Sequence, residues 1–220
     1  MPKYMRSIFV IAGLVALIAV PVHAATVAAT GEGWCGLYAV GGERCGNTDT
    51  SLIRNTYAGN SPGEGVFRDW FAFNIPSLGG PVLNATLWIW NHGWNSTQDP
   101  SGTYTLYNPS AIDYASLAVG PGLGSVTAAV ADTGVSHYVG IPLNATALSL
   151  LNAAQGSQFL FGGAVDIIDP SLLVEFFGYT DGTPVAMLDL NSTAIPEPGM
   201  IGMLLGGLAA LGLARRRRLV

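Results

Sequence analysis

The middle of the chain carries short runs in which apolar and polar residues alternate. The clearest of them covers residues 66–75. Its apolar face is formed by Phe67, Phe71, Phe73 and Ile75, and its other face includes Arg68, Trp70 and Asn74. Asp69 interrupts the apolar face. Because alternation with a period of two is typical of a strand that buries one face, this run predicts a β-strand.

The run at residues 82–90 has the same period. One side carries Leu83, Ala85, Leu87 and Ile89, and the other carries Asn84, Thr86, Trp88 and Trp90. Further strand candidates cover residues 103–107, 126–130, 135–141, 158–161, 172–179 and 184–190. Turn residues separate these runs, in a chain with 29 glycines and 13 prolines. Short strands punctuated in this way predict an antiparallel β-sandwich.

One segment departs from the strand pattern. Residues 145–154 have the spacing of a short helix in which Leu148 and Leu151 face inward. Asn144 is placed to cap the start of this helix, and Gly156 is placed to end it. We therefore expect an all-β domain with one short connecting helix.

The N-terminal end has the composition of a targeting segment. Two basic residues precede the apolar run at residues 8–20, and small residues lead up to Ala24. This is the pattern of a secretory signal peptide that is cleaved after Ala24. The prediction assigns residues 1–24 to the signal peptide and residues 25–190 to the β-sandwich ectodomain.

The C-terminal end predicts a membrane segment. Residues 200–214 are uncharged and apolar, so their burial in hydrocarbon is favourable and predicts a transmembrane helix. An Arg-rich tail, residues 215–220, follows the helix and is expected to stay cytoplasmic by the positive-inside rule. A linker at residues 191–199 precedes the helix, and its prolines interrupt regular helical structure.

This end of the chain resembles the PEP-CTERM sorting signal of Gram-negative bacteria. The resemblance is carried by Pro196, Glu197 and Pro198, the apolar segment after them, and the cluster Arg215, Arg216, Arg217 and Arg218. It implies that an exosortase, a membrane-embedded transpeptidase, cleaves the tail. It also implies export through the inner membrane, transient anchoring with the ectodomain in the periplasm, and a final place at the cell surface or outside the cell. The alternative is an ordinary membrane anchor that begins with Pro-Glu-Pro.

The ectodomain resembles a recurrent type of PEP-CTERM ectodomain over most of its length. The matching pieces are residues 70–76, 83–87, 104–107, 143–145 with Leu148, and 159–164. They correspond to predicted strands, turns and the helix cap. The resemblance implies a jelly-roll-like β-sandwich, and it transfers no catalytic residue.

The net charge of the ectodomain, without the predicted signal peptide and the C-terminal sorting segment, limits the classes of partner that it can bind. Residues 25–195 contain three arginines, no lysine and 13 acidic residues, so their formal net charge is near −10. Nucleic acids and anionic lipids are bound by lysine and arginine side chains. We therefore expect no nucleic-acid partner, and membrane contact only through the C-terminal helix before cleavage.

The chain contains two cysteines, Cys35 and Cys45. The predicted signal peptide sends them to an oxidising compartment, where a disulfide is favoured over free thiols. Gly41 and Gly42 lie between them and are compatible with a hairpin-like loop. The pair therefore predicts a structural disulfide.

Candidates for catalysis or metal binding are few. Neither histidine of the ectodomain lies in a zinc-protease spacing, and no G-x-S-x-G sequence is present. Glu175 with Asp166 or Asp169 is a candidate carboxylate pair for glycoside hydrolysis, but the sequence does not fix their separation. Asp166, Asp169 and Asp181 are candidate Ca²⁺ ligands. Solvated loops are the simpler interpretation, so we expect no metal, no cofactor and no catalytic activity.

An aromatic cluster is the candidate binding site. It comprises Trp88, Trp90 and Trp94, with His92, Asn91 and Asn95 between or beside them and Tyr104 and Tyr107 as further candidates. Exposed rings of this kind suit the apolar face of a sugar. The alternative interpretation is that Trp88 and Trp90 cover the outer face of a sheet or a second core.

Three functions follow from these features. The leading expectation is a non-enzymatic exported protein of the cell surface or extracellular matrix, associated with biofilm and exopolysaccharide and sorted by an exosortase. The first alternative is a carbohydrate-binding module that recognises exopolysaccharide through the aromatic platform. The second is a polysaccharide hydrolase.

Overall fold

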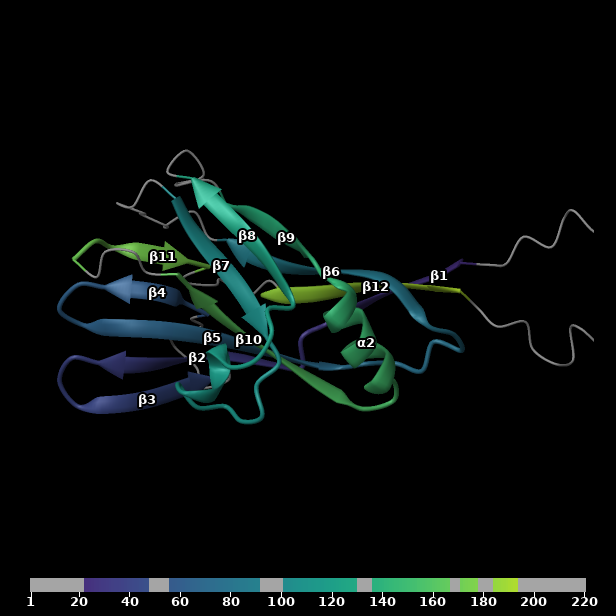
Figure 1. Cartoon of the computed structure of the whole chain (residues 1–220), viewed down its shortest axis with the longest axis horizontal. Helices are drawn as coiled ribbons and strands as arrows, with labels where there is room; N and C mark the ends of the chain where they lie inside the picture. The colour runs from purple at the N-terminus through teal and green to yellow at the C-terminus, as the bar shows by residue number, and fades with distance from the viewer. Residues whose placement is uncertain are drawn as a thin grey trace, which may run out of the picture.

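A computed structural model describes residues 22–47, 56–91, 101–129, 136–166, 171–177 and 184–193 of the chain. In these ranges it consists of two antiparallel β-sheets, an α-helix and a short 3-10 helix (Figure 1). The helices of this described part are too short to cross a membrane. The predicted transmembrane helix, the sorting motif and nearly all of the predicted signal peptide lie outside the described residues.

The smaller sheet has four strands in the order β1-β12-β6-β9. They are β1 (Val22–Ala28), β12 (Ala186–Thr193), β6 (Val82–Asn91) and β9 (His137–Pro142). All neighbouring pairs are antiparallel. We call this sheet A.

The larger sheet, sheet B, has eight strands. They are β2 (Gly31–Tyr38), β3 (Gly42–Asn47), β4 (Ala58–Ser61), β5 (Gly65–Asn74), β7 (Ser101–Tyr107), β8 (Gly124–Ala129), β10 (Gln158–Val165) and β11 (Val174–Phe176). Strand β5 organises this sheet, because β2 pairs along one of its edges while β4 and β10 share the other. Strands β7 and β8 extend the sheet beyond β10, β11 pairs with β4, and β3 pairs with β2.

The core lies between the two sheets. Sheet B contributes Phe71, Phe73, Leu106 and Phe161, and sheet A contributes Leu87, Ile89, Ile141 and Leu188. The predicted apolar faces of β5 and β6 therefore point inward, apart from one position in β6. The predicted all-β antiparallel sandwich with one helix is confirmed. The jelly-roll-like detail stays a prediction, because these sheets have four and eight strands rather than the eight in total of a simple jelly roll.

The prediction that Leu83 shares a face with Ala85, Leu87 and Ile89 is wrong. Asn191 pairs with Asn84, but the next residue, Ser192, pairs with Val82, so Leu83 is an extra residue in β6. An extra residue reverses the alternation of the strand beyond it. Val82 is consequently buried, whereas Leu83 is 53% exposed.

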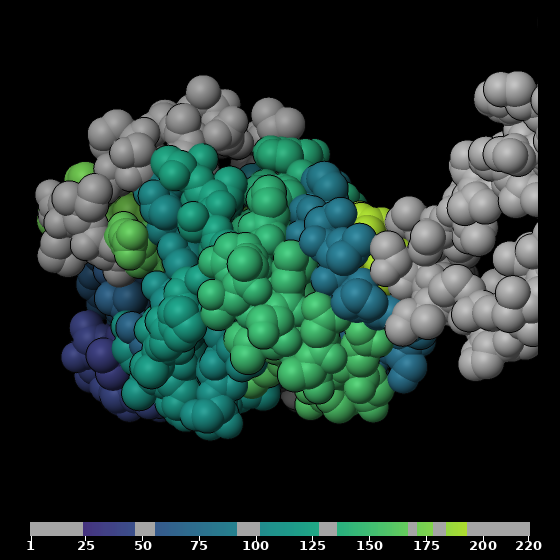
Figure 2. Space-filling model, turned by 45° about the vertical axis from the view of Figure 1, so that its right-hand side comes forward, coloured from purple at the N-terminus to yellow at the C-terminus, as the bar shows by residue number. Residues whose placement is uncertain are grey.

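The outer face of sheet B is covered as well. Trp70, Ala72, Cys35 and Leu117 form a second buried cluster on this face. Leu117 belongs to the short helix η2 (Ser116–Ala118) in the connection between β7 and β8. Strand β5 is therefore buried on both faces, which a simple alternation of exposed and buried positions did not predict. Figure 2 shows the teal part of the chain, which includes β7, β8 and the connection between them, next to the green part that includes the α-helix on one face of the molecule.

The helix α2 (Ala145–Ala153) agrees with the prediction to within one residue. Its N-cap is Asn144, whose Oδ1 accepts a hydrogen bond from the backbone N–H of Ala147 at 3.1 Å. Leu151 is buried, and Leu148 packs against the core. The helix closes one end of the sandwich beside Val82, where the Asn152 side chain bonds both the N–H and the carbonyl of that residue.

Strands β1 and β12 run past the domain boundaries expected from the sequence. β1 begins at Val22, before the predicted cleavage after Ala24, and β12 continues through Thr193 into the predicted linker. The cause is pairing, since Val22 lies opposite Thr193 and Ala24 opposite Asn191. The start of β1 and the end of β12 therefore lie side by side at one end of sheet A (Figure 1). The cleavage site itself stays a prediction.

Candidate ligand-binding face and sorting segment

The side of sheet A that faces away from the core carries a mixed aromatic and polar surface. We call it the outer face, and define it by Trp88, Trp90, Tyr138, Asn84, Asn191, Thr26 and Asp189. These residues alternate along their strands with core residues such as Leu87, Ile89 and Leu188. The period of two therefore places them together on the opposite side.

Trp88 is fixed on this face by two contacts. Its indole Nε1 donates a hydrogen bond of 2.8 Å to Oδ2 of Asp189 on the neighbouring strand. On the other side, Gly140 of β9 lies opposite Trp88 in the register. A Cβ at Gly140 would come within 2.7 Å of the ring atom Cζ3, so the ring occupies the space that a side chain would fill. The indole therefore has one defined position against the sheet.

Asp189 holds a second partner at the same time. Its Oδ1 accepts a hydrogen bond of 2.6 Å from the Thr26 hydroxyl, which lies directly opposite it on β1. The carboxylate thus joins three strands: β1 through Thr26, its own strand β12, and β6 through Trp88. Hydrogen bonds to a charged acceptor are stronger than neutral ones, so this arrangement stiffens the position of the indole.

Trp90 packs against Tyr138, the residue opposite it on β9. The two ring centroids are 4.9 Å apart, and the planes meet at 66°, an edge-to-face geometry that aromatic pairs favour. The Tyr138 hydroxyl donates to the Pro184 carbonyl at 2.9 Å. Partial burial raises the pKa of Tyr138, and the negative charge of Glu32 adds to that shift. Tyr138 therefore stays a neutral hydrogen-bonding group on this face.

Two amides complete the outer face at the end where β12 leaves the sheet. Asn84 and Asn191 lie opposite each other, and Nδ2 of Asn191 donates to Oδ1 of Asn84 at 2.6 Å. A side-chain amide carries two N–H donors and an oxygen with two acceptor sites. The pair therefore keeps donor and acceptor capacity beyond the bond that joins it.

The candidate residues from the sequence have different places in the structure. Trp88 and Trp90 lie together on the outer face, partly exposed. Trp94 lies outside the described residues. Including Tyr104 in the platform was wrong, because Tyr104 is 0% exposed in the core. Tyr107 is on sheet B, opposite Gly162, so it does not belong to the face either.

The sequence reasoning missed four residues of the outer face, and also Gly140, which makes room for Trp88. The four are Tyr138, Asp189, Asn191 and Thr26, and they come from three other strands. Their alternation with apolar neighbours could have assigned each to the outer side of its own strand. The strand order and register bring them next to the tryptophans, and no motif in the sequence carries that information.

A second aromatic cluster, also missed, lies on sheet B. It consists of Trp34 and Tyr38 of β2, Phe67 of β5, and Tyr57. Its closest pair, Tyr57 and Phe67, has ring centroids 4.7 Å apart. Burial, followed by the charges of Glu175 and Glu64, raises the pKa of Tyr57 far above its usual range. Phe67 and Tyr57 are buried and Trp34 is half-buried, so this cluster extends the packing of the sheet.

Asp69 forms a buried polar pair with Tyr104. Both side chains are 0% exposed, and the Tyr104 hydroxyl donates to Oδ1 of Asp69 at 2.7 Å. Burial raises the pKa of Asp69 well above its usual range, and the bond from Tyr104 offsets part of that shift. Gly163 makes room for the pair, because a Cβ there would lie 1.8 Å from the Tyr104 oxygen. Burial therefore favours the neutral form of Asp69 inside the core.

The acidic residues considered for metal binding or hydrolysis are only partly described. Asp166 is exposed at the end of β10, while Asp169 and Asp181 lie outside the described residues. Glu175 is half-buried on β11, and burial together with the charge of Glu64 raises its pKa. In the described ranges, no group of three or more His, Cys, Asp or Glu side chains has the geometry to hold a metal ion.

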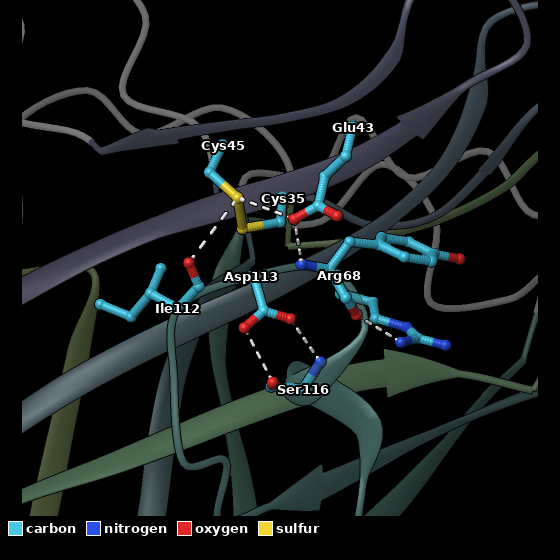
Figure 3. The surroundings of a disulfide bond; sticks show 8 residues. Cys35, Glu43, Cys45, Arg68, Ile112, Asp113 and Ser116 are labelled. Atoms are coloured by element: carbon cyan, nitrogen blue, oxygen red, sulfur yellow. Dashed lines mark hydrogen bonds between the residues drawn. A yellow bond between two sulfur atoms is a disulfide. The ribbon is translucent and has the colours of Figure 1, made fainter.

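Cys35 and Cys45 form the predicted disulfide, which joins opposite residues of β2 and β3. The connection between β7 and β8 docks beside it (Figure 3). Glu43 accepts a hydrogen bond from the backbone N–H of Tyr114 at 2.7 Å, and the Arg68 guanidinium donates to the Tyr114 carbonyl. Arg68 also lies over the Tyr114 ring, 4.1 Å from its centroid. These contacts hold the covering segment on sheet B and give the disulfide a structural role.

Together, the fold and the outer face describe an antiparallel β-sandwich domain with an aromatic and polar surface on its smaller sheet. The last strand of this domain ends at Thr193. The family model of the PEP-CTERM protein-sorting motif matches residues 194–218, directly after that strand. The chain therefore carries a PEP-CTERM sorting domain, as predicted. This motif implies export, transient C-terminal membrane anchoring and processing by an exosortase.

An adhesin domain is among the solved structures to which this chain is similar. The crystal structure of the K1 cleaved adhesin domain of Lys-gingipain from Porphyromonas gingivalis W83 aligns with 76% of this chain and 88% of that chain. The sequence identity is 14% and the TM-score is 0.28. No curated protein sequence matches the chain.

Proposed function

We propose that the protein is a non-catalytic component of the cell surface or extracellular matrix, delivered there after an exosortase removes its tail. The observation that supports this proposal is the position of the sorting motif. It begins at residue 194, one residue after the last strand of the ectodomain ends. Cleavage within the motif would therefore release the folded sandwich with almost no additional chain.

Intact-mass spectrometry of the exported protein tests this proposal. Cells with active exosortase should yield a product whose C-terminus lies near Pro196, and cells without the enzyme should retain the full tail. Replacing Pro196, Glu197 and Pro198 by alanine should block cleavage. The matched control is Met200→Leu, which keeps the apolar segment apolar and should leave cleavage intact. A product ending at Val220 in cells with active exosortase would contradict the proposal.

The absence of catalytic activity is part of the same proposal. It rests on the sequence, which contains none of the nucleophile or zinc-ligand motifs considered above. The direct test incubates the exported protein with exopolysaccharide from the producing cells and measures new reducing ends. We expect none above background. A time-dependent increase that disappears in Glu175→Gln would instead support the hydrolase alternative.

We also propose exopolysaccharide as a partner of the ectodomain. The outer face favours this partner, because it presents a fixed indole with polar groups beside it. Affinity electrophoresis tests the association: the exported protein should migrate more slowly in a gel containing exopolysaccharide from the same cells. Unchanged migration would refute the partnership while leaving the sorting proposal standing.

A further inference from the structure

The outer face of sheet A has the features of a prepared binding surface around Trp88. The indole is held from one side by Asp189, at 2.8 Å, and sits in the space left open by Gly140. Asp189 is itself held by Thr26. An aromatic ring that is already fixed loses little conformational entropy when a ligand stacks on it.

The chemistry of the face selects among possible ligands. Its seven residues include one carboxylate, Asp189, and no lysine or arginine. Nucleic acids and anionic lipids require cationic side chains, so they do not fit. Both oxygens of Asp189 already accept hydrogen bonds, which makes it a poor cation ligand. A neutral molecule with an apolar face and hydroxyl groups remains, and this is the chemistry of a pyranose ring.

The size of the face indicates a chain of sugars. Trp88 and the amide of Asn84 lie on the same strand, four residues apart, which corresponds to about 13 Å along a β-strand. A single ring stacked on Trp88 does not reach the Asn84–Asn191 pair at that distance. A ligand that uses both parts of the face therefore has to be an oligosaccharide that runs along β6.

We propose that the outer face binds a neutral stretch of the exopolysaccharide of the producing cell, with one pyranose ring stacked on Trp88 and a further unit hydrogen-bonded to the Asn84–Asn191 pair. This inference rests on the proposed exopolysaccharide partnership and adds the site and the class of sugar. Binding should fall when the Trp88 ring is removed, and also when the ring is kept but displaced.

The experiment measures binding of the full chain, purified in a detergent without a sugar headgroup. The probes are immobilised cellohexaose, mannohexaose and chitohexaose as neutral chains, alginate hexasaccharide as an anionic chain, and glucose as a single ring. The wild type should bind at least one neutral hexasaccharide more tightly than both glucose and the alginate probe. Trp88→Ala should weaken that binding by at least about tenfold.

Two further variants separate the site from effects on folding. Gly140→Ala retains the indole but places a methyl group where the ring lies, so it should weaken binding as well. Trp88→Phe keeps an aromatic ring without the N–H that bonds Asp189, and serves if Trp88→Ala does not fold. Trp34→Ala, in the aromatic cluster of sheet B, is the matched control and should bind within about twofold of the wild type. Circular dichroism confirms that each variant is folded.

The possible outcomes distinguish this inference from the proposed function. Loss of binding in the Trp88 and Gly140 variants, with retention in Trp34→Ala, supports the site. If none of the neutral hexasaccharides binds, or if Trp34→Ala alone loses binding, the inference is overturned. If the folded Trp88 variants still associate with exopolysaccharide as the wild type does, the site is wrong and the partnership stands. If the wild-type protein does not bind exopolysaccharide, the proposed partnership itself is refuted.

Discussion

Replacing Asp69 by asparagine should make the protein more stable, and the gain should grow as the pH rises. Asp69 is completely buried, with Oδ1 accepting a hydrogen bond of 2.7 Å from Tyr104. Its other carboxyl oxygen, Oδ2, is buried with no hydrogen-bond partner. Asparagine has nearly the same shape, keeps an oxygen for Tyr104 and does not ionise. The substitution therefore removes the titration and leaves the packing almost unchanged.

The expected pH dependence of the free energy of unfolding comes from one buried group, the carboxyl of Asp69. Burial raises the pKa of folded Asp69, whereas the unfolded chain has an ordinary value of about 3.9. Folding therefore takes up a proton between these two values. The free energy of unfolding of the wild type should fall, through Asp69, by about 1.4 kcal/mol per pH unit from the unfolded pKa up to the folded pKa. Below pH 4 this contribution of Asp69 is fully retained.

Chemical denaturation of the purified ectodomain at pH 4.5, 5.5 and 6.5 measures the effect. The difference between Asp69→Asn and wild type cancels the titration of all other carboxylates, and it should increase in favour of the variant as the pH rises, by up to about 1.4 kcal/mol per pH unit. Asp113→Asn is the control. Hydrogen bonds from Ser116 lower the pKa of Asp113, so its contribution to stability is fully present above the unfolded pKa of about 3.9, and the difference between Asp113→Asn and wild type should stay constant across these three pH values. A pH-independent difference for Asp69→Asn would refute a neutral buried acid.

Two further predictions concern the local supports of the fold. Reducing the Cys35–Cys45 disulfide, which closes a loop with a sequence separation of 10, should lower the free energy of unfolding by about 3 kcal/mol in the chain-entropy model; denaturation midpoints unaffected by reductant would contradict this. Asn144→Ala removes the cap that bonds Ala147 and should cost about 1 kcal/mol in the same assay. Thr146→Ala, an exposed change in the first turn of the helix, is its control, and an equal loss there would show that the cap is not responsible.

The central strands could be predicted because their sequences carry the information themselves. In β5 and β6, large apolar residues alternate with others, and a period of two matches the buried face that the structure shows. Helix α2 could be predicted as well, because Asn144 caps its start and Gly156, with a positive φ of 78°, follows soon after its end. These elements reflect local rules that hold without knowledge of the partner strands.

The remaining parts depend on partners that are distant in the sequence. Strands β2 and β3 contain several glycines, which lower strand propensity, and pairing with β5 together with the disulfide defines them. The position of Leu83 depends on an irregularity opposite Ser192. Tyr104 could be assigned to the core only once Asp69, 35 residues away, was known to be its partner. The placement of these residues depends on the register between paired strands, and the sequence of a single strand does not encode that register.

The position of the outer face relative to the chain ends links sorting to binding. Strand β12 leaves sheet A at Thr193, and Trp88 lies opposite Met187 on the same strand. Met187 and Thr193 are six residues apart on β12, which corresponds to about 20 Å along the strand. Asn84 and Asn191 therefore lie nearer than Trp88 to the point where the chain continues into the sorting motif. The proposed binding mode places the stacked sugar at the end of the face that is further from this point. We therefore expect the tail-bearing form to bind as well as the released one, and Trp88→Ala should weaken retention of exopolysaccharide on cells that lack the exosortase.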